Sequence, residues 1–429
     1  MIENLYRIFQ KHPVITTDSR KVSPESIFFA LKGENFNGNR FADNALQEGA
    51  AYVVVDEPAS GKDDRYLLTK DVLSTLQELA QYHREKLAIP IIAITGSNGK
   101  TTTKELIHAT LSQNYRTYST SGNLNNHIGV PLTLLSIQPD TEIAVVEMGA
   151  NHSGEIAFLC NMARPTHGLI TNIGKAHLEG FGSLEGVVHA KTELYDFLRK
   201  GDGTVFINIE DSLLMDHADG LTKITYGFNP EAGVSGNVIP GSDCLELELI
   251  INNPISQLIN SNLFGMYNAL NILAAASVGD YFDIPANMIA SAMNAYRPDN
   301  NRSQIKKTER NLLILDAYNA NPSSMSLVLK EFTGTIGSRK MAILGDMLEI
   351  GANADEEHQK ILILLEELDF SQVILVGPVF SQLNTNPDWK CFETSELAKE
   401  WILRNTIENK TILLKGSRAI RLEEIVESL

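Results

Sequence analysis

Cysteine is scarce in this chain of 429 residues, and its three cysteines stand far apart, at Cys160, Cys244 and Cys391. Their number is odd and no CxxC pair occurs, so we expect neither a disulfide framework nor a structural zinc site. The pattern fits a reducing, cytoplasmic compartment. No apolar run reaches about 18 residues, and the N-terminus carries no long apolar stretch. We therefore expect no signal peptide and no membrane insertion.

Basic residues are also few relative to acidic ones, with 36 Lys and Arg against 53 Asp and Glu and a formal net charge of −17. This balance argues against a nucleic-acid partner, although a local cationic pocket could still bind a phosphorylated substrate. Hydrophobic residues make up 43 % of the chain and charged residues 21 %, which is typical of a globular protein.

Strand-like apolar runs alternate with helix-like amphipathic runs along most of the chain, which predicts an α/β fold with parallel sheets. A first small unit ends with a polar helical stretch near residue 85. A polar segment with a proline, at about 297–304, is typical of a linker. We therefore predict three domains, covering residues 1–85, 86–298 and 299–429.

A phosphate-binding loop is the clearest local motif. The strand-like run IPIIAIT is followed by GSNGKTT and then by a helix-like run. In a P-loop, glycines let backbone N–H groups face phosphates, a lysine reaches the β- and γ-phosphates, and a Thr hydroxyl ligates Mg²⁺. Ile94 stands where the longer GxxxxGK[ST] form has its first glycine, and an incidental strand–turn–helix junction is the alternative. The combination of features favours nucleotide binding by Thr95, Gly96, Ser97, Asn98, Gly99, Lys100, Thr101 and Thr102.

Two further residues are candidate magnesium ligands because each follows a predicted strand. Glu147 ends the run EIAVVE, and a carboxylate at the carboxyl end of a strand beside the P-loop strand is well placed to hold Mg²⁺. His177 lies just past the next strand. Imidazole is an unusual magnesium ligand, so a loop residue that only forms hydrogen bonds is the alternative for His177.

Lys191 occupies an unexpected position in the predicted helix LEGVVHAKTELYDFL, residues 184–198. It lies within the apolar stripe formed by positions spaced three and four apart. One interpretation is that its stem packs while its ammonium group extends to water. The other is that burial favours the neutral amine, which could add CO₂ and become a carbamate that ligates a second Mg²⁺.

Several long motifs, in order along nearly the whole chain, resemble the Mur ligases of peptidoglycan synthesis. They are TDSRKV (17–22), TGSNGKTTTKE (95–105), NLNNHIGVPLTLL (123–135), EMGAN (147–151), NIGKAHLEGFGS (172–183), HAKTEL (189–194), NALNILAA (268–275), DAYNANPSSM (316–325), LGDMLEIG (344–351) and LLKGSRAIRLEEI (413–425). YNANPSSM, LGDMLEIG and KGSRAIRLE are most similar to members that add D-alanyl-D-alanine to UDP-N-acetylmuramoyl-tripeptide.

The resemblance implies a three-domain architecture with a central P-loop ATPase domain and a C-terminal Rossmann-like domain. It implies that ATP phosphorylates the substrate carboxylate and that the amine of the incoming dipeptide attacks the acyl phosphate. By similarity, Thr101 and Glu147 hold one Mg²⁺, while His177 and carbamylated Lys191 hold a second. Lys100, His177 and Lys191 are then the catalytic residues. A monomer is expected.

The resemblance also suggests roles for polar residues outside the P-loop, each with a simpler alternative. Asp18, Ser19 and Arg20 resemble a turn that holds the uridine end, and the alternative is a helix-capping turn. Asn126 resembles part of a substrate-facing loop, or is a turn residue. The candidates for adenine contact are Asn268 and Asn271, preceded by Tyr267 where many members have histidine. Arg302 resembles an arginine that reaches the γ-phosphate, or is a solvated linker residue. Candidates for contact with ATP or D-Ala-D-Ala are Asp316, Tyr318, Asn319, Asn321, Lys415, Ser417 and Arg418.

Other functions compete with this one. A related ligase could add the third residue of the stem peptide, or glutamate to a folate, with the same chemistry. YNANPSSM and KGSRAIRLE argue against that, and we find no DNPR-like motif. A P-loop switch, or a purely structural nucleotide-binding role, would leave the His177–Lys191 pair unexplained.

Overall fold

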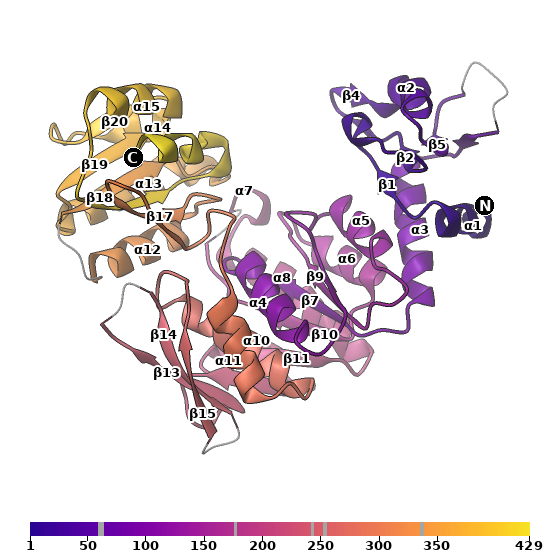
Figure 1. Cartoon of the computed structure of the whole chain (residues 1–429), viewed down its shortest axis with the longest axis horizontal. Coiled ribbons are helices and arrows are strands. Elements are labelled where there is room, and N and C mark those ends of the chain that lie inside the picture. Colours follow the sequence, from indigo (N-terminus) through magenta and orange to yellow (C-terminus); the bar gives the residue numbers. More distant parts are fainter. Residues whose placement is uncertain (59–63, 176–177, 242–243, 252–254, 335–338) are drawn as a thin grey trace.

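The computed structural model describes residues 1–58, 64–175, 178–241, 244–251, 255–334 and 339–429. The chain forms three successive α/β units, and the first and third lie apart on either side of the central one (Figure 1). The predicted α/β fold with parallel sheets is therefore confirmed. None of the described helices combines the length and apolar character needed to cross a bilayer.

The first unit contains a four-stranded parallel sheet in the order β1-β2-β5-β6. A short antiparallel pair, β3 and β4, follows β2. Its elements are α1 (Ile2–Lys11), β1 (Ile15–Thr16), β2 (Ile27–Phe29), β3 (Lys32–Gly33), β4 (Phe36–Asn37), α2 (Ala42–Gln47), β5 (Tyr52–Val55), β6 (Tyr66–Leu68) and α3 (Val72–Lys86).

The central unit contains a nine-stranded sheet in the order β15-β14-β13-β12-β11-β10-β7-β9-β8, parallel from β8 to β13 and antiparallel beyond. Its strands are β7 (Ile91–Thr95), β8 (Thr117–Ser119), β9 (Ile143–Glu147), β10 (His167–Ile170), β11 (Thr204–Asn208), β12 (Thr222–Gly227), β13 (Val234–Ile239), β14 (Glu246–Ile251) and β15 (Ile255–Asn260). Its helices are α4 (Lys100–Leu111), α5 (Gly129–Leu135), α6 (Glu155–Ala163), α7 (Leu178–Phe181), α8 (Leu184–Lys200), α9 (Ser212–His217), α10 (Asn268–Tyr281) and α11 (Ala286–Ala295).

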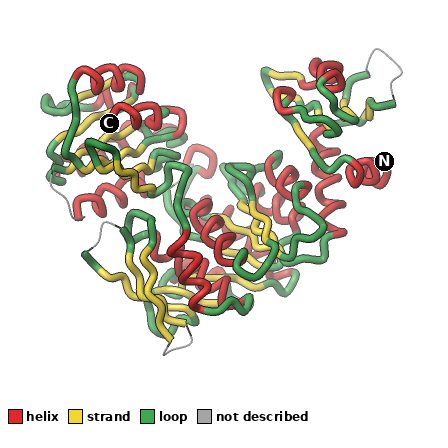
Figure 2. The backbone as a smooth tube through the Cα atoms, viewed as in Figure 1, coloured by secondary structure: helices red, strands yellow, loops and turns green. Residues whose placement is uncertain are grey.

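Helices cover both faces of the parallel part of the central sheet (Figure 2). Because side chains alternate along a strand, Ile91 and Ala93 of β7 join the core beneath α5, α6 and α8, whereas Ile92 and Ile94 join the core beneath α4 and α10. Burial on both faces explains why the strands are apolar at nearly every position. It also leaves the carboxyl edge of the sheet as the place where loops carry polar residues.

The third unit contains a six-stranded sheet in the order β16-β17-β21-β18-β19-β20, parallel except for the first pair. This parallel sheet with helices on its faces agrees with the predicted Rossmann-like unit. Its elements are β16 (Gln304–Lys307), β17 (Leu312–Asp316), α12 (Pro322–Gly334), β18 (Lys340–Gly345), α13 (Ala354–Glu367), β19 (Gln372–Val376), α14 (Pro378–Leu383), β20 (Lys390–Phe392), α15 (Ser395–Arg404) and β21 (Thr411–Lys415).

Candidate functional site

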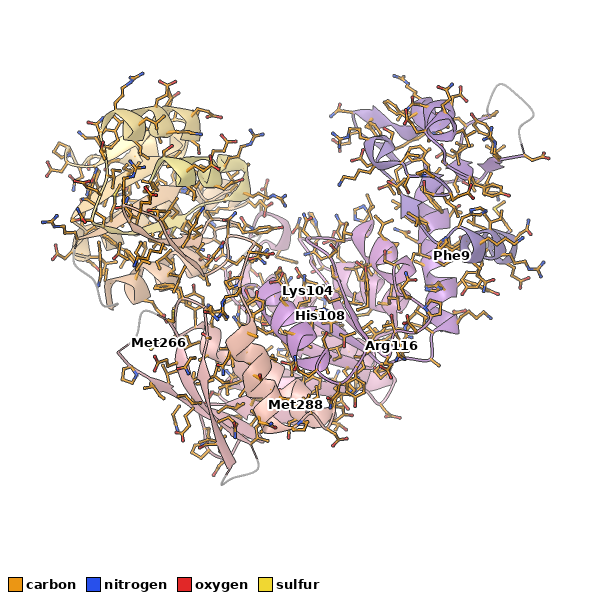
Figure 3. The ribbon with its side chains drawn as sticks, viewed as in Figure 1. Phe9, Lys104, His108, Arg116, Met266 and Met288 are labelled. Carbon is orange, nitrogen blue, oxygen red and sulfur yellow. The ribbon has the colours of Figure 1, made fainter. Side chains whose placement is uncertain are left out.

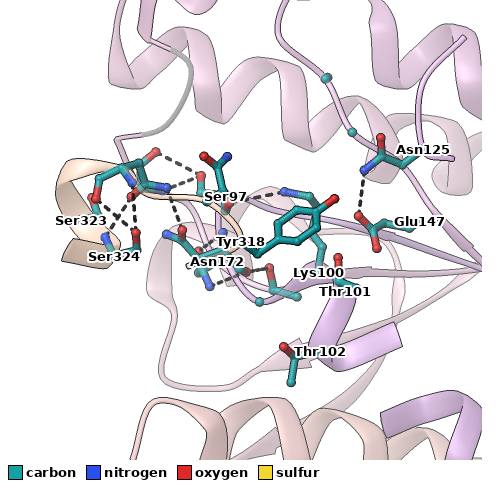
Figure 4. A pocket seen from close by; sticks show the side chains of 18 of the residues that line it. Ser97, Lys100, Thr101, Thr102, Asn125, Glu147, Asn172, Tyr318, Ser323 and Ser324 are labelled. Atoms are coloured by element: carbon teal, nitrogen blue, oxygen red, sulfur yellow. Dashed lines mark hydrogen bonds between the residues drawn. The ribbon is translucent and has the colours of Figure 1, made fainter. Parts of the chain in front are cut away.

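The GSNGKTT segment forms a tight turn between β7 and α4, as predicted (Figure 4). Gly96 and Gly99 have φ angles of 141° and 81°, in the region that favours glycine. A Cβ at Gly96 would lie 2.0 Å from Thr171 Oγ1, and one at Gly99 would lie 2.8 Å from Asn271 Oδ1. Both positions therefore require glycine. The turn leaves the free N–H groups of the α4 N-terminus available for an anion.

Lys100 starts helix α4 and its side chain folds back over the turn. Its Nζ donates hydrogen bonds to the carbonyl oxygens of Gly96, at 2.7 Å, and Ser97, at 3.3 Å. Burial lowers the pKa of Lys100, the positive charge of Arg302 lowers it further, and Glu147 opposes both. A bound phosphate would offset both the burial and the repulsion, so the local charge suits an anionic ligand.

The loop that follows β10 supports the P-loop from one side. The Ser97 amide donates to Asn172 O at 2.9 Å, and the Asn98 amide donates to Asn172 Oδ1 at 3.0 Å. Asn172 Nδ2 in turn donates to Asn98 O at 3.0 Å. These bonds fix the backbone on which phosphate binding depends, so Asn172 is a functional residue that our sequence reasoning missed.

Glu147 ends β9, the strand that pairs with β7, so its carboxylate stands at the same sheet edge as the P-loop. The side chain is buried, and Oε1 accepts a hydrogen bond from Asn125 Nδ2 at 2.8 Å. Oε2 is buried and has no hydrogen-bond partner in the described part of the chain. An unpartnered buried carboxylate oxygen, in a residue that lines the same cavity as Thr101, fits a Mg²⁺ site completed by phosphate oxygens.

Lys191 lies in the middle of α8, and the structure excludes the interpretation in which its ammonium group reaches water. The residue is 1 % exposed, and its Nζ is 3.5 Å from Ala150 O and 5.3 Å from the centroid of the Phe181 ring. Burial, aided by the charge of Lys100, lowers its pKa to about 7, although Glu155 and Glu193 oppose the shift. A substantial fraction of neutral amine near pH 7 fits the chemistry of CO₂ addition.

The predicted ligands of the second Mg²⁺ include His177, which lies outside the described residues. Within the described ranges, no group of three His, Cys, Asp or Glu side chains could hold a metal. The role of His177 therefore stays a prediction.

The third unit contributes cations and an aromatic ring that face the P-loop. Arg302 stacks its guanidinium 3.7 Å above the Tyr318 ring, and Arg418 Nη1 donates to the Tyr318 hydroxyl at 3.2 Å. Lys415 Nζ donates to Asp316 Oδ2 at 2.6 Å, so the ends of β17 and β21 meet at this edge. The stacking excludes the alternative of a freely solvated Arg302 side chain.

The asparagines proposed from the resemblance form internal hydrogen bonds. Asn268 and Asn271 are joined at 2.8 Å on the first turn of α10, and Asn271 Oδ1 accepts from Thr103 Oγ1 at 3.1 Å. Asn126 Oδ1 accepts from the Gly129 amide at 2.8 Å and so caps α5. All three line the same cavity as the P-loop, so their contact with a ligand stays a prediction.

Most of the predicted site residues line one cavity of about 1280 Å³ between the central and third units. Thr95 and Gly96 are not among its lining residues, and Lys191 is buried nearby rather than at the surface of the cavity. The cavity lining includes the predicted residues Ser97, Asn98, Gly99, Lys100, Thr101, Thr102, Asn126, Glu147, Asn268, Asn271, Arg302, Asp316, Tyr318, Asn319, Asn321, Lys415, Ser417 and Arg418.

Asp18, Ser19 and Arg20 lie apart from this cavity, in the first unit. Asp18 caps the short 3₁₀ helix Ser19–Lys21, and Arg20 Nη2 lies 2.8 Å from Asp18 Oδ2. This is the capping turn that the sequence allowed, and it leaves a substrate role untested.

Asn125, which donates to Glu147, was omitted from our site prediction, although it was detectable because it belongs to the NLNN motif.

A P-loop at the carboxyl edge of a parallel sheet, facing a second α/β unit across a polar cavity, defines a multidomain nucleotide-binding enzyme. Three family models match the chain: "Mur ligase family, catalytic domain" at residues 13–93, "Mur ligase middle domain" at 94–279 and "Mur ligase, glutamate ligase domain" at 301–418. The chain belongs to the Mur ligase family.

Similar curated proteins match over nearly their whole length. A UDP-N-acetylmuramoyl-tripeptide--D-alanyl-D-alanine ligase of Bacillus subtilis is 36 % identical over 430 residues, covering 97 % of this chain and 92 % of the relative. The Escherichia coli protein of the same name is 34 % identical, with 97 % and 93 % covered.

Solved structures of similar proteins share the fold. A MurF crystal structure from Acinetobacter baumannii has a TM-score of 0.87 and 29 % identity, covering 97 % of this chain and 92 % of its own. A MurF ligase from Thermotoga maritima in complex with ADP has a TM-score of 0.85 and 25 % identity, covering 97 % and 96 %.

Proposed function

We propose that this protein joins D-alanyl-D-alanine to UDP-N-acetylmuramoyl-tripeptide in a reaction driven by ATP. The observation that carries the proposal is the single cavity that brings the P-loop, the buried carboxylate of Glu147 and the polar strand ends of the third unit together. The similarity to ligases with that name, over 97 % of the chain, supports the same substrates.

The proposed reaction has two successive steps, a phosphoryl transfer and then an acyl transfer. The terminal carboxylate of the tripeptide attacks the γ-phosphorus, a C–O–P bond forms, and ADP leaves. The neutral amine of D-Ala-D-Ala then attacks the acyl carbon, phosphate leaves with the bonding electrons, and the amine loses a proton. The carboxylate and the γ-phosphate are both anionic, so cations must bring them together. Lys100 at the P-loop and Arg302 at the opposite wall supply two of the required charges.

We also propose the metal set given by the sequence. Thr101 and Glu147 would hold one Mg²⁺, and His177 with carbamylated Lys191 would hold a second, whose positive charge screens the meeting anions. The Lys191 carbamate forms by attack of the neutral amine on CO₂, with release of one proton. The low pKa of this buried lysine supports the step, because it raises the fraction of amine able to react.

The remaining assignments follow the same proposal. Asp18, Ser19 and Arg20 would hold the uridine end in the first domain, and the domain limits stay at 1–85, 86–298 and 299–429. Asn268 and Asn271 would face the adenine. The residues at the mouth of the third unit, Asp316, Tyr318, Asn319, Asn321, Lys415, Ser417 and Arg418, would contact ATP or the dipeptide. A monomeric, cytoplasmic enzyme stays a prediction.

The deciding experiment measures phosphate release from ATP and Mg²⁺ with UDP-N-acetylmuramoyl-tripeptide and one acceptor at a time. The acceptors are D-Ala-D-Ala, meso-diaminopimelate, L-lysine or none, and the product mass is checked. We expect release only with D-Ala-D-Ala, together with a UDP-linked pentapeptide. Release with another amino acid would indicate a related ligase, and release without any acceptor would indicate a nucleotide switch.

Replacing Lys191 tests the carbamate. We expect Lys191→Ala to lower the ligation rate by at least about 1000-fold, because the anionic ligand is lost. Added short-chain carboxylates should restore part of the rate, because the alanine leaves room for them. Full activity of Lys191→Ala without additives would disprove the carbamate.

A further inference from the structure

The segment between the central and third units is held by a residue of the P-loop helix. Glu105 lies on α4, next to Lys104, which is labelled in Figure 3. Its Oε2 accepts a hydrogen bond from the Tyr296 hydroxyl at 2.5 Å, and Asn300 Nδ2 lies 3.0 Å from both carboxylate oxygens. Glu105 is not among the residues that line the nucleotide cavity. It contacts the linker instead of a ligand.

A second anchor holds the linker just past Arg302. The Ser303 amide donates to Asp316 Oδ1 at 3.1 Å, and Ser303 O accepts from the Phe264 amide at 3.0 Å. Ser303 Oγ also lies 2.8 Å from the Tyr267 hydroxyl. One residue thus bonds the third unit and the central unit at once.

Arg302 lies between the two anchors, and the backbone on both sides of it is bent. Asn301 and Ser303 have φ angles of 55° and 50°, a conformation that is uncommon for non-glycine residues, although asparagine adopts it more readily than most. The Arg302 guanidinium is fixed over Tyr318, and its buried Nε has no partner among the described residues. The anchors therefore hold a cation in a defined place with donor capacity left for a ligand.

We propose that Glu105 is a positioning residue that sets where Arg302 meets the phosphates of the nucleotide. It does so from the P-loop helix itself, through Tyr296 and Asn300, so the helix that starts at Lys100 also fixes the opposing cation. The inference rests on the proposed function for its catalytic consequence. It adds a residue that contacts neither nucleotide nor peptide.

The test is a double-mutant cycle on Glu105→Ala and Arg302→Ala. We expect Glu105→Ala to lower kcat for ligation about tenfold, because a small displacement of a charge that acts in the transition state is costly. The double variant should be no slower than Arg302→Ala alone, because Glu105 acts only through Arg302. Asn300→Ala should reproduce part of the loss.

A second arm measures calorimetric affinity without any peptide, using a non-hydrolysable ATP analogue and ADP. We expect Glu105→Ala and Arg302→Ala each to weaken binding of the analogue about fivefold and to leave ADP within twofold, because the two nucleotides differ by the γ-phosphate. Nucleotide affinity can be measured even if the wild-type protein proves to join other substrates. The role of Glu105 and the proposed function can therefore be disproved independently.

Glu331→Ala is the matched control. Glu331, on α12 of the third unit, accepts a hydrogen bond from the Met266 amide of the central unit at 2.5 Å, and Met266 is labelled in Figure 3. This variant loses carboxylate bonds between the same two units, from the Met266 and Tyr267 amides, but leaves the Glu105 anchor intact, and we expect kcat within twofold of wild type. Three results would overturn the inference: an equal loss in Glu331→Ala, additive losses in the cycle, or an unchanged kcat in Glu105→Ala.

Discussion

The first and third units are attached to the central unit by different kinds of contact. At the first junction, helix α3 packs on α1 of its own unit and on α5 and α6 of the central unit. Its residues Leu76, Leu79 and Ala80 belong to one apolar cluster that includes Phe29 of the first sheet and Leu159 of α6. The two units therefore share a core, as parts of one rigid body do.

At the other junction, polar bonds accompany an apolar contact in which Phe264 of the central unit joins the core cluster of the third unit. Asn321 Nδ2 donates to Asn98 Oδ1 at 2.8 Å, so the third unit bonds the P-loop directly. Lys175 Nζ lies 3.4 Å from Glu357 Oε1, and the Phe264 ring packs edge to face on the Phe332 ring. Polar contacts of this kind exchange readily with water. We therefore predict that the first junction is fixed and that the third unit opens and closes, a motion that often controls ligase-type chemistry.

The largest expected effect comes from breaking the first junction at Arg84. This residue is 7 % exposed, and its guanidinium donates to Ala163 O, Leu87 O and Arg164 O at 2.7, 2.7 and 2.9 Å. Arg84→Ala leaves these three carbonyl oxygens without their donor, so the free energy of unfolding measured with urea should fall by about 3 kcal/mol. Arg164→Ala, which removes an exposed ion pair with Glu85, should cost under about 1 kcal/mol.

The next effect is on activity, at the second junction. Asn321→Ala removes the bond to Asn98, and we expect kcat/KM for ATP to fall about tenfold while the unfolding free energy changes by about 1 kcal/mol or less. Asn321→Ala also removes the Oδ1 that accepts from the Ser324 amide at the start of α12, so Ser324→Ala, which disturbs the same turn but keeps the bond to Asn98, is the control. Equal losses of activity in both variants would remove the argument for a closing contact.

A smaller effect should appear in acid, and part of it arises at the first junction. Burial lowers the pKa of His83 below its ordinary 6.5, although a bond to Ile137 O opposes the shift. The unfolded chain then binds the proton at higher pH than the folded one, so stability falls as pH drops below 6.5 through the lowered folded pKa. His83→Gln should reduce, but not abolish, the fall of the urea midpoint between pH 7 and 5, because burial also lowers the pKa values of His108 and His167 in the central unit.

The smallest effect concerns the ion pair between Lys175 and Glu357. Lys175 is half exposed, so Lys175→Ala should cost about 0.5 kcal/mol or less and the loss should vanish in high salt. Small-angle scattering without nucleotide should nevertheless show a larger radius of gyration. Lys360→Ala, which removes the partner of Glu357 on its own helix, should leave the scattering unchanged.

The features that could be predicted from the sequence are those set by the pattern of neighbouring residues. The P-loop between β7 and α4, the position of Glu147 at a strand end and the place of Lys191 in the apolar stripe of α8 all followed from periodicity and from the order of strand, turn and helix. The fold class followed from the alternation of strands and helices. These features depend on residues within one or two turns of each other.

The parts missed depend on contacts between distant segments. Glu105 bonds Tyr296, 191 positions away, and Asn98 bonds Asn321, 223 positions away. Neither pair has a local signal, because a Glu on a helix and an Asn in a loop are ordinary in sequence. The interpretation in which the Lys191 ammonium group extends to water was wrong for a similar reason. The sequence pattern of α8 does not reveal what covers the apolar face of the helix.

The two glycines of the P-loop turn bear on antibacterial resistance. Any side chain at Gly96 would collide with Thr171, and one at Gly99 with Asn271. A compound that binds against this stretch of backbone would face a surface that point mutation cannot reshape without displacing the turn itself. Compounds that rely on Tyr318 or Arg418 would instead meet side chains that a single codon change can replace.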